Sequence, residues 1–316
     1  MEPRKVQTVA LAGATGNVGK WTLKALVADG FRVTVLARRQ ASFPDGVAVK
    51  VVDFGSSDAL TEALRGHDAF VDCTLVHDDT PARLMDAAAA AGVYRYIPSD
   101  FSLDLHNRNV HGLPVFFRKD ANDRHLFRTC EETGMTWSVV CNGAFLDWNL
   151  RSGFMNIDVH GRRVDYIGDG ANVHAWTTLE ATGKAVSGAL RRAAETENRP
   201  VYVHSVNKSQ RQMADLCKEA LGGADDDWEE SRSDMDEVLA GALREFHAGN
   251  FGWNVLGDMI RYANSRPDFS CPWEKSDNAL LGVETMTDDE VKGLIRAIAA
   301  EKTVSASTTF SSRTVV

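Results

Sequence analysis

Several marks of other protein classes are missing from this sequence of 316 residues. Its five cysteines form no CxxC pair and no HExxH stretch is present, which argues against structural zinc, c-type haem or any other metal site. No apolar run approaches the ~18–20 residues that cross a bilayer. An apolar run starts within the first ten residues, where a signal peptide would lie. We therefore expect a cytoplasmic protein that is not inserted in a membrane.

An excess of positive charge is also absent, since the chain has 35 lysines and arginines against 44 aspartates and glutamates. The formal net charge is −9 and the isoelectric point is near 5.5, which argues against a protein that binds nucleic acid along its phosphate backbone. A local basic pocket for a small phosphorylated ligand is still compatible with this balance. The hydrophobic content of 44% and charged content of 25% are those of globular proteins, so the chain can bury a large core.

A third absence concerns chemistry. Many short-chain reductases use a Tyr-x-x-x-Lys pair as proton donor, and no lysine stands four residues after any of the five tyrosines. A reductase with this sequence therefore needs another donor.

The first half of the chain repeats one unit. Short apolar runs rich in β-branched residues alternate with longer segments of helical period, and the runs cover residues 6–13, 31–37, 47–52, 69–74, 94–99 and 137–141. Runs that are apolar throughout are typical of strands buried on both faces of a parallel sheet. The pattern predicts an α/β fold with a Rossmann-type doubly wound parallel sheet. Asp29-Gly30 is expected to end the first helix.

The pattern changes after about residue 150. We expect an NADP-binding Rossmann domain at 1–155, to which later segments return, and a smaller, mainly helical substrate lobe of mixed structure at 156–302. Capping-box pairs predict three helix starts in the second half, at Thr177/Glu180, Ser209/Gln212 and Thr287/Glu290. Residues 303–316 form a Ser/Thr-rich tail, expected to be mobile or to pack on a neighbour. The oligomeric state is not indicated.

A glycine-rich loop, GATGNVG at residues 13–19, follows the first predicted strand and opens the first predicted helix. This context is typical of a dinucleotide site, where helix N-terminal amides face the pyrophosphate. The spacing is G-x-x-G-x-x-G rather than G-x-G-x-x-G. Gly13 would make the turn, Gly16 would let the phosphates approach, and Gly19 would let the helix pack closely on the strand. Thr15, Asn17 and Val18 complete the expected contacts. The alternative is a plain strand–helix turn.

Two arginines, Arg38 and Arg39, end the second predicted strand with no carboxylate before them. NAD sites place an acidic residue here, whereas an arginine fork suits the 2′-phosphate of NADP(H). The alternative is a pair of solvated arginines. Other residues at strand ends are expected to complete the cofactor site, namely Asp53, Phe54, Thr74, Ser99 and Asn142.

Lys119 stands within FFRKDANDRH, a segment with the pattern of an amphipathic helix. By itself the pattern is equally compatible with a solvated helix face. A lysine is protonated at neutral pH and can act as an acid without special tuning. Lys119 is therefore a candidate proton donor for hydride transfer.

These motifs together resemble the NmrA-like, isoflavone reductase-like branch of the atypical short-chain dehydrogenases. The resemblance rests on the glycine loop, Arg38, the stretches RYIPSDF and FFRKDANDRH, and Asn142 with Phe145. It implies an NADPH-dependent reductase in which a lysine, here Lys119, replaces the Tyr/Lys pair or holds the nicotinamide ribose. The chain departs from the family where Pro-Ser-Glu-Phe-Gly is replaced by residues 98–102, PSDFS.

Aromatic residues are concentrated after the lysine segment. Four of them are expected to line an apolar substrate pocket, namely Phe145, Trp148, Phe251 and Trp253, although each would also suit a small core. Phe246, Tyr262 and Trp273 are further candidates for the wall of this pocket. The sequence therefore predicts an NADPH-dependent reductase of an aromatic or conjugated small molecule. The alternatives are a non-catalytic NADP(H) sensor, as in some members of the family, or an NADP-binding scaffold for non-redox cyclisation or isomerisation.

Overall fold

Seven parallel strands form the main sheet of the computed structural model, which describes residues 5–76, 78–222 and 227–301. Their order is β11-β6-β5-β4-β1-β2-β3. The strands are β1 (Thr8–Ala12), β2 (Arg32–Ala37), β3 (Ala48–Val51), β4 (Ala69–Asp72), β5 (Arg95–Ile97), β6 (Thr136–Cys141) and β11 (Arg199–Tyr202). The strand order reverses between β1 and β4, and open sheets bind ligands at the carboxyl ends of the strands at such a point.

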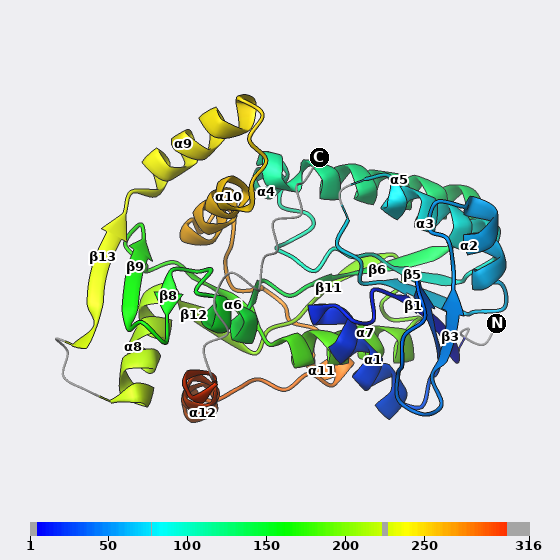
Figure 1. Cartoon of the computed structure of the whole chain (residues 1–316), viewed down its shortest axis with the longest axis horizontal. Coiled ribbons are helices and arrows are strands. Elements are labelled where there is room, and N and C mark those ends of the chain that lie inside the picture. Colours follow the sequence, from blue (N-terminus) through cyan, green and yellow to red (C-terminus); the bar gives the residue numbers. More distant parts are fainter. Residues whose placement is uncertain (1–4, 77, 223–226, 302–316) are drawn as a thin grey trace.

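Helices cover both faces of this sheet, as Figure 1 shows. One face carries α2 (Ser57–Leu64), α3 (Thr80–Ala90) and α5 (Phe117–Thr133), and the other carries α1 (Asn17–Ala28), α7 (Leu179–Arg191) and α11 (Asn278–Leu281). Within β1, Val9 and Leu11 belong to one buried cluster, and Ala10 and Ala12 belong to the other. Both faces of this central strand are therefore buried, which explains its apolar sequence and confirms the doubly wound sheet, whereas the edge strand β3 is mostly exposed.

Most of the predicted helix boundaries are confirmed. Asp29 is the C-cap of α1, followed by Gly30 at a φ of 82°. Ser209 and Thr287 open α8 (Gln210–Leu221) and α12 (Asp288–Ala300) with complete capping boxes.

The predicted cap Thr177 is wrong by one position, because Thr178 caps α7. Thr177 is the last residue of β10 (Val173–Thr177), and its buried hydroxyl lies 2.5 Å from the Asn142 carbonyl oxygen and 3.1 Å from that of Val203. The Thr177 hydroxyl is therefore hydrogen-bonded to buried backbone oxygens, and the adjacent Thr178 is the N-cap of α7.

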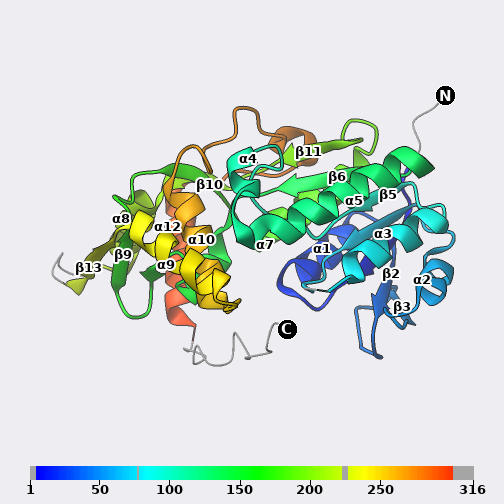
Figure 2. The same cartoon turned by 90° about the horizontal axis from the view of Figure 1, so that it is seen from above.

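The second part of the structure combines helices with two three-stranded sheets (Figure 2). One sheet has the order β12-β10-β7 and the other β13-β9-β8. The further strands are β7 (Ala144–Phe145), β8 (Ile157–Asp158), β9 (Arg163–Ile167), β12 (Val206–Ser209) and β13 (Glu229–Ser233), and the further helices are α4 (Arg108–His111), the short 3-10 helix η1 (Pro114–Phe116), α6 (Leu146–Ser152), α9 (Met235–His247) and α10 (Trp253–Ser265). The helical C-terminal region predicted from the sequence is present. We propose that the two domains divide near residue 155, with α7, β11 and α11 returning to the first.

Within the described ranges, none of the helices combines the length and the apolar character needed to span a bilayer. The tail expected at residues 303–316 lies outside the described residues.

A buried histidine in β10 makes the fold sensitive to acid. His174 is fully buried and stacked on Trp176, and burial lowers its pKa to about 4. As the pH falls, the His174 imidazole is therefore protonated near pH 6.5 in the unfolded chain but only near pH 4 in the folded protein. The stabilising effect of the neutral ring is complete above pH 6.5 and is lost as the pH falls through this window, by about 3 kcal/mol.

We expect the variant His174→Leu to lose less unfolding free energy than the wild type between pH 7 and about pH 4.5, as measured by urea denaturation. Asp72, whose pKa burial raises to about 6, acts in the opposite direction in both proteins and cancels in the comparison. Equal acid sensitivity of the two proteins would contradict the role given to His174.

Candidate active site

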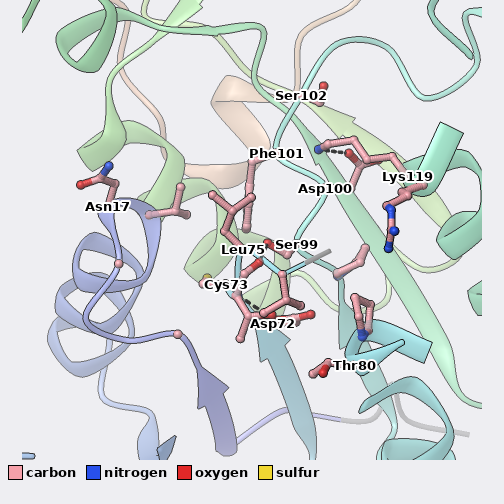
Figure 3. A pocket seen from close by; sticks show the side chains of 18 of the residues that line it. Asn17, Asp72, Cys73, Leu75, Thr80, Ser99, Asp100, Phe101, Ser102 and Lys119 are labelled. Atoms are coloured by element: carbon pink, nitrogen blue, oxygen red, sulfur yellow. Dashed lines mark hydrogen bonds and ion pairs between the residues drawn. The ribbon is translucent and has the colours of Figure 1, made fainter. Parts of the chain in front are cut away.

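A pocket of about 1950 Å³ opens at the carboxyl ends of the main-sheet strands. It runs from the glycine loop after β1 to side chains of α9 and α10 in the second part of the chain. Pockets for one drug-sized ligand measure about 300–1,000 Å³, so this one has room for two ligands together. Figure 3 shows side chains from the ends of β4 and β5, from α1 and from α5 around it.

The glycine loop has the geometry that a dinucleotide pyrophosphate requires. Gly13 adopts a φ of 75°, and a Cβ there would lie 2.4 Å from the Cys73 carbonyl oxygen. A Cβ on Gly19 would lie 2.0 Å from the Gly13 carbonyl oxygen, so Gly19 allows α1 to pack on the loop as predicted. The first turn of α1 holds no acidic residue, and its positive end faces the pocket through Asn17 and Val18. The loop therefore fits a diphosphate.

Both arginines after β2 line the same pocket. The side chains of Arg38 and Arg39 are exposed, and neither has a hydrogen bond or ion pair with any described residue. Asp53 and Phe54 lie in the adjoining loop after β3 and also line the pocket. The two guanidinium groups are thus available to an anionic group at this end of the pocket.

The base of the pocket is polar and tightly hydrogen-bonded. The buried Asp72 carboxylate at the end of β4 accepts hydrogen bonds of 2.7 Å from the amide and the hydroxyl of Thr74. The Ser99 hydroxyl donates to the Thr74 carbonyl oxygen at 2.6 Å. Burial raises the pKa of Asp72 to about 6, although both Thr74 contacts oppose this. These contacts hold the ends of β4 and β5 side by side beneath the pocket (Figure 3).

Lys119 projects into the pocket from the first turn of α5. Its ammonium group forms an ion pair and hydrogen bond with the carboxylate of Asp100, which follows β5 (Figure 3). The Lys119 side chain is 33% exposed and that of Asp100 is 11% exposed. The lysine is therefore fixed in direction yet open to a bound ligand.

Aromatic side chains form the far wall. All four residues expected there line the pocket, as does the further candidate Phe246, and Phe154 joins them. Ring contacts connect the wall, with centroid distances of 5.3 Å for Trp148–Phe154, 5.4 Å for Phe154–Trp253 and 5.1 Å for Phe246–Phe251. The wall combines rings from α6 and α10 with residues between them, so it exists only in the folded chain.

Two residues expected at the cofactor, Gly19 and Asn142, lie outside the residues that line the pocket. Asn142 is buried; its side-chain NH₂ donates to the Gly143 carbonyl oxygen, and its backbone carbonyl oxygen accepts from the Thr177 hydroxyl. Gly143, next to it, does line the pocket. Gly19 lies beneath the loop, and every other residue predicted for the cofactor lines the pocket.

Three acidic side chains at the site were not predicted from the sequence, namely Asp72, Asp100 and Asp123. Asp72 is hidden inside an apolar strand, where it looks like part of the run. Asp123 follows Lys119 by four residues and thus shares its helix face, a spacing that could have revealed it. Asp123 lines the pocket and is only 3% exposed.

Comparison with known proteins agrees with this geometry. Residues 13–166 match the family model described as NAD(P)H-binding. The oxidoreductase PoxI of Penicillium oxalicum is 29% identical over 293 residues, which cover 89% of this chain and 91% of the relative.

Two solved structures share the fold. Isoflavone reductase superposes with a TM-score of 0.71 at 19% identity, covering 90% of this chain and 98% of the other. The binary complex of leucoanthocyanidin reductase with NADPH from Vitis vinifera superposes with a TM-score of 0.73 at 16% identity, covering 93% and 100%. With its dinucleotide loop and doubly wound sheet, the chain is thus similar over most of its length to an oxidoreductase, matches an NAD(P)H-binding model over residues 13–166, and shares its fold with isoflavone reductase.

Proposed function

We propose that the protein reduces an aromatic or other conjugated small molecule, with NADPH as hydride source and Lys119 as proton donor. The observation that carries the proposal is the position of Lys119, which lines one continuous pocket together with the glycine loop and the aromatic wall. Among the described residues that line this pocket, Lys119 is the one lysine, and tyrosine and histidine are absent. The proton that a tyrosine donates in many other short-chain reductases must therefore come from another residue here.

Reduction builds negative charge on the substrate, which a donor must neutralise. Bound NADPH would supply the hydride. Lys119 carries a proton that it can release, and Asp100 keeps the ammonium group directed into the pocket. The Cys73 thiol also lines the pocket, but burial raises its pKa far above neutral. Asp72 and Asp123 also line the pocket, but they are only 1% and 3% exposed, whereas the Lys119 side chain is 33% exposed. This leaves Lys119 as the donor best placed for the reaction.

The substrate class follows from the pocket lining. The aromatic wall offers ring faces for stacking. Four large apolar side chains that line the pocket are exposed to solvent, namely Leu75, Phe117, Phe251 and Trp253. Exposed apolar groups around a concave site favour an apolar ligand. A solved structure with this fold, that of AtPrR2, holds NADP+ together with (+)-pinoresinol, and this pairing supports an aromatic ligand beside the cofactor.

The direct test is oxidation of NADPH in the presence of a panel of enones and aromatic ketones, with product identified by mass spectrometry. We expect turnover with at least one aromatic acceptor. Tight NADPH binding without oxidation by any acceptor would instead favour the NADP(H) sensor or the non-redox scaffold.

Preference for NADPH over NADH is assigned to Arg38. Replacing Arg38 by alanine removes a guanidinium from the 2′-phosphate, and a charge-assisted hydrogen bond contributes ~1.5–3 kcal/mol. We expect the Kd for NADPH to rise by about 10- to 100-fold and the Kd for NADH to be unchanged, as measured by nicotinamide fluorescence. Arg32→Ala is the matched control, because Arg32 begins the same strand and does not line the pocket. If the wild type bound NADPH and NADH with equal affinity, Arg38 would not confer a preference for NADPH.

A further inference from the structure

The carboxyl group of Asp123 is buried in the site without a donor. Its side chain lies on α5 one turn after Lys119 and lines the pocket, yet it is only 3% exposed. No N–H or O–H group of the described residues hydrogen-bonds either of its oxygens. A carboxylate in such a position would be costly, because buried charges need a partner.

The neighbour that Asp123 does have is another carboxyl group. Burial first, and then the negative charge of Asp100 in contact with it, hold the pKa of Asp123 well above its usual range, although Lys119 opposes this. Two adjoining carboxyl groups do not both ionise readily. Asp100 takes the negative charge, since it is the one bonded to the Lys119 ammonium. Asp123 is therefore the neutral acid, and its hydroxyl can donate to Asp100.

Other charged groups face this cluster without satisfying it. Asp120, on the same turn of α5, adds a smaller negative contribution at Asp123; it is itself hydrogen-bonded to Arg124 and lies 3.1 Å from His111 Nδ1. The Cys141 thiol on β6 faces Asp100, Asp104 and Asp123, and burial raises its pKa well above the ordinary value, so it is neutral. The three connected groups are thus a carboxylic acid, a carboxylate and an ammonium.

We propose that Asp123 holds a proton that it passes through Asp100 to Lys119 as Lys119 protonates the substrate. This inference rests on the proposed reduction. The substrate receives a hydride, with its two electrons, from the reduced nicotinamide and a proton from Lys119. Asp100 takes the Asp123 proton on one oxygen and gives a proton to the Lys119 amine. Lys119 ends as ammonium and both carboxyl groups end as carboxylates.

Charge balance favours this transfer. Hydride loss gives the nicotinamide ring a positive charge, and the three-group cluster loses one positive charge in the same event. The net charge of the pocket is therefore unchanged, which avoids the electrostatic cost of an unbalanced charge beside buried carboxyl groups. A proton from solvent restores Asp123 after the product leaves, so one proton is consumed per turnover. Asp123 acts through Lys119 and is a positioning residue rather than a catalytic residue.

The stored proton can be observed without any substrate. At about pH 8, Asp72 is ionised because its pKa is about 6. We expect the infrared spectrum of the full chain to show the C=O stretch of a protonated carboxyl group at that pH. The band should disappear in Asp123→Asn and persist in the control Asp120→Asn. A spectrum without the band in the wild type, or with an unchanged band in Asp123→Asn, would overturn the inference whatever the substrate.

Kinetics give the second test. Asparagine at position 123 keeps the volume and a donor toward Asp100 but holds no acidic proton, so kcat should fall by about 10- to 100-fold with little change in KM. The second readout is kcat as a function of the fraction of D₂O in the solvent. In the wild type, where several protons move, this plot should be curved, and in Asp123→Asn it should be linear. Asp123→Glu should recover part of the curvature. A curve retained by Asp123→Asn would overturn the relay, whereas a carboxyl band without turnover in the wild type would overturn the proposed function instead.

Discussion

Lys119→Ala should lower kcat for the reduction by about 10²- to 10⁴-fold, which is the usual contribution of a positioned general acid. The variant removes the ammonium group that points into the pocket, so the charge developing on the substrate is no longer neutralised. The measurement is steady-state NADPH oxidation with the best acceptor, together with the NADPH Kd from fluorescence. Turnover at the wild-type rate would show that another group protonates the substrate.

A second substitution separates proton donation from cofactor binding. Arginine at position 119 keeps the positive charge and the ion pair with Asp100, but a guanidinium does not release its proton near neutral pH. A donor role predicts that Lys119→Arg loses as much activity as Lys119→Ala. A role limited to the nicotinamide ribose predicts that Lys119→Arg retains most activity and that Lys119→Ala mainly raises the NADPH Kd. Lys20→Ala, on the exposed side of α1, is the control for loss of a lysine.

Gly13→Ala should abolish NADPH binding and lower the free energy of unfolding by about 2–5 kcal/mol. Two costs combine at this residue: an L-residue at a φ of 75° costs roughly 1–2 kcal/mol, and the new Cβ would lie 2.4 Å from the backbone oxygen of Cys73. Relief would require the ends of β1 and β4 to separate, at an overpacking cost of about 1–3 kcal/mol. The readouts are urea denaturation and a fluorescence titration with NADPH.

Gly30→Ala is the matched control for this prediction. Gly30 has a similar φ of 82°, but a Cβ there would meet nothing within 4 Å. We expect a loss of only about 1–2 kcal/mol from backbone strain and an unchanged NADPH affinity. If the two variants lost equal stability, the contact with Cys73 would contribute nothing.

The local parts of the site were predictable because each depends on neighbouring residues. The glycine loop occupies seven consecutive positions. The strand before it and the helix after it directly flank these positions in the sequence. The arginines follow a strand whose end faces the same direction as the ends of its parallel neighbours. The periodicity of FFRKDANDRH likewise indicated the helix that carries Lys119.

Residues that depend on distant contacts were predicted less well. Thr177 and Thr178 are equivalent in the sequence, and only the packing of β10 against Asn142 and Val203 decides which one caps α7. Tyr262 and Trp273 were further candidates for the aromatic wall, but neither is part of the pocket lining. Tyr262 packs on Phe269 at 5.4 Å, and the Trp273 indole donates a hydrogen bond to Val203.

The sequence by itself determined the class of fold, the dinucleotide loop and the helix of Lys119, because periodicity, glycine spacing and capping are local properties of the chain. Tertiary structure alone decided the surroundings of that lysine. Asp100 meets it from the end of β5, and the adjoining Asp123 is buried beside Asp100 when α5 packs over the sheet. Burial and the nearness of like charges depend on which segments meet in space, and these two effects convert a charged helix face into a cluster that can hold a proton.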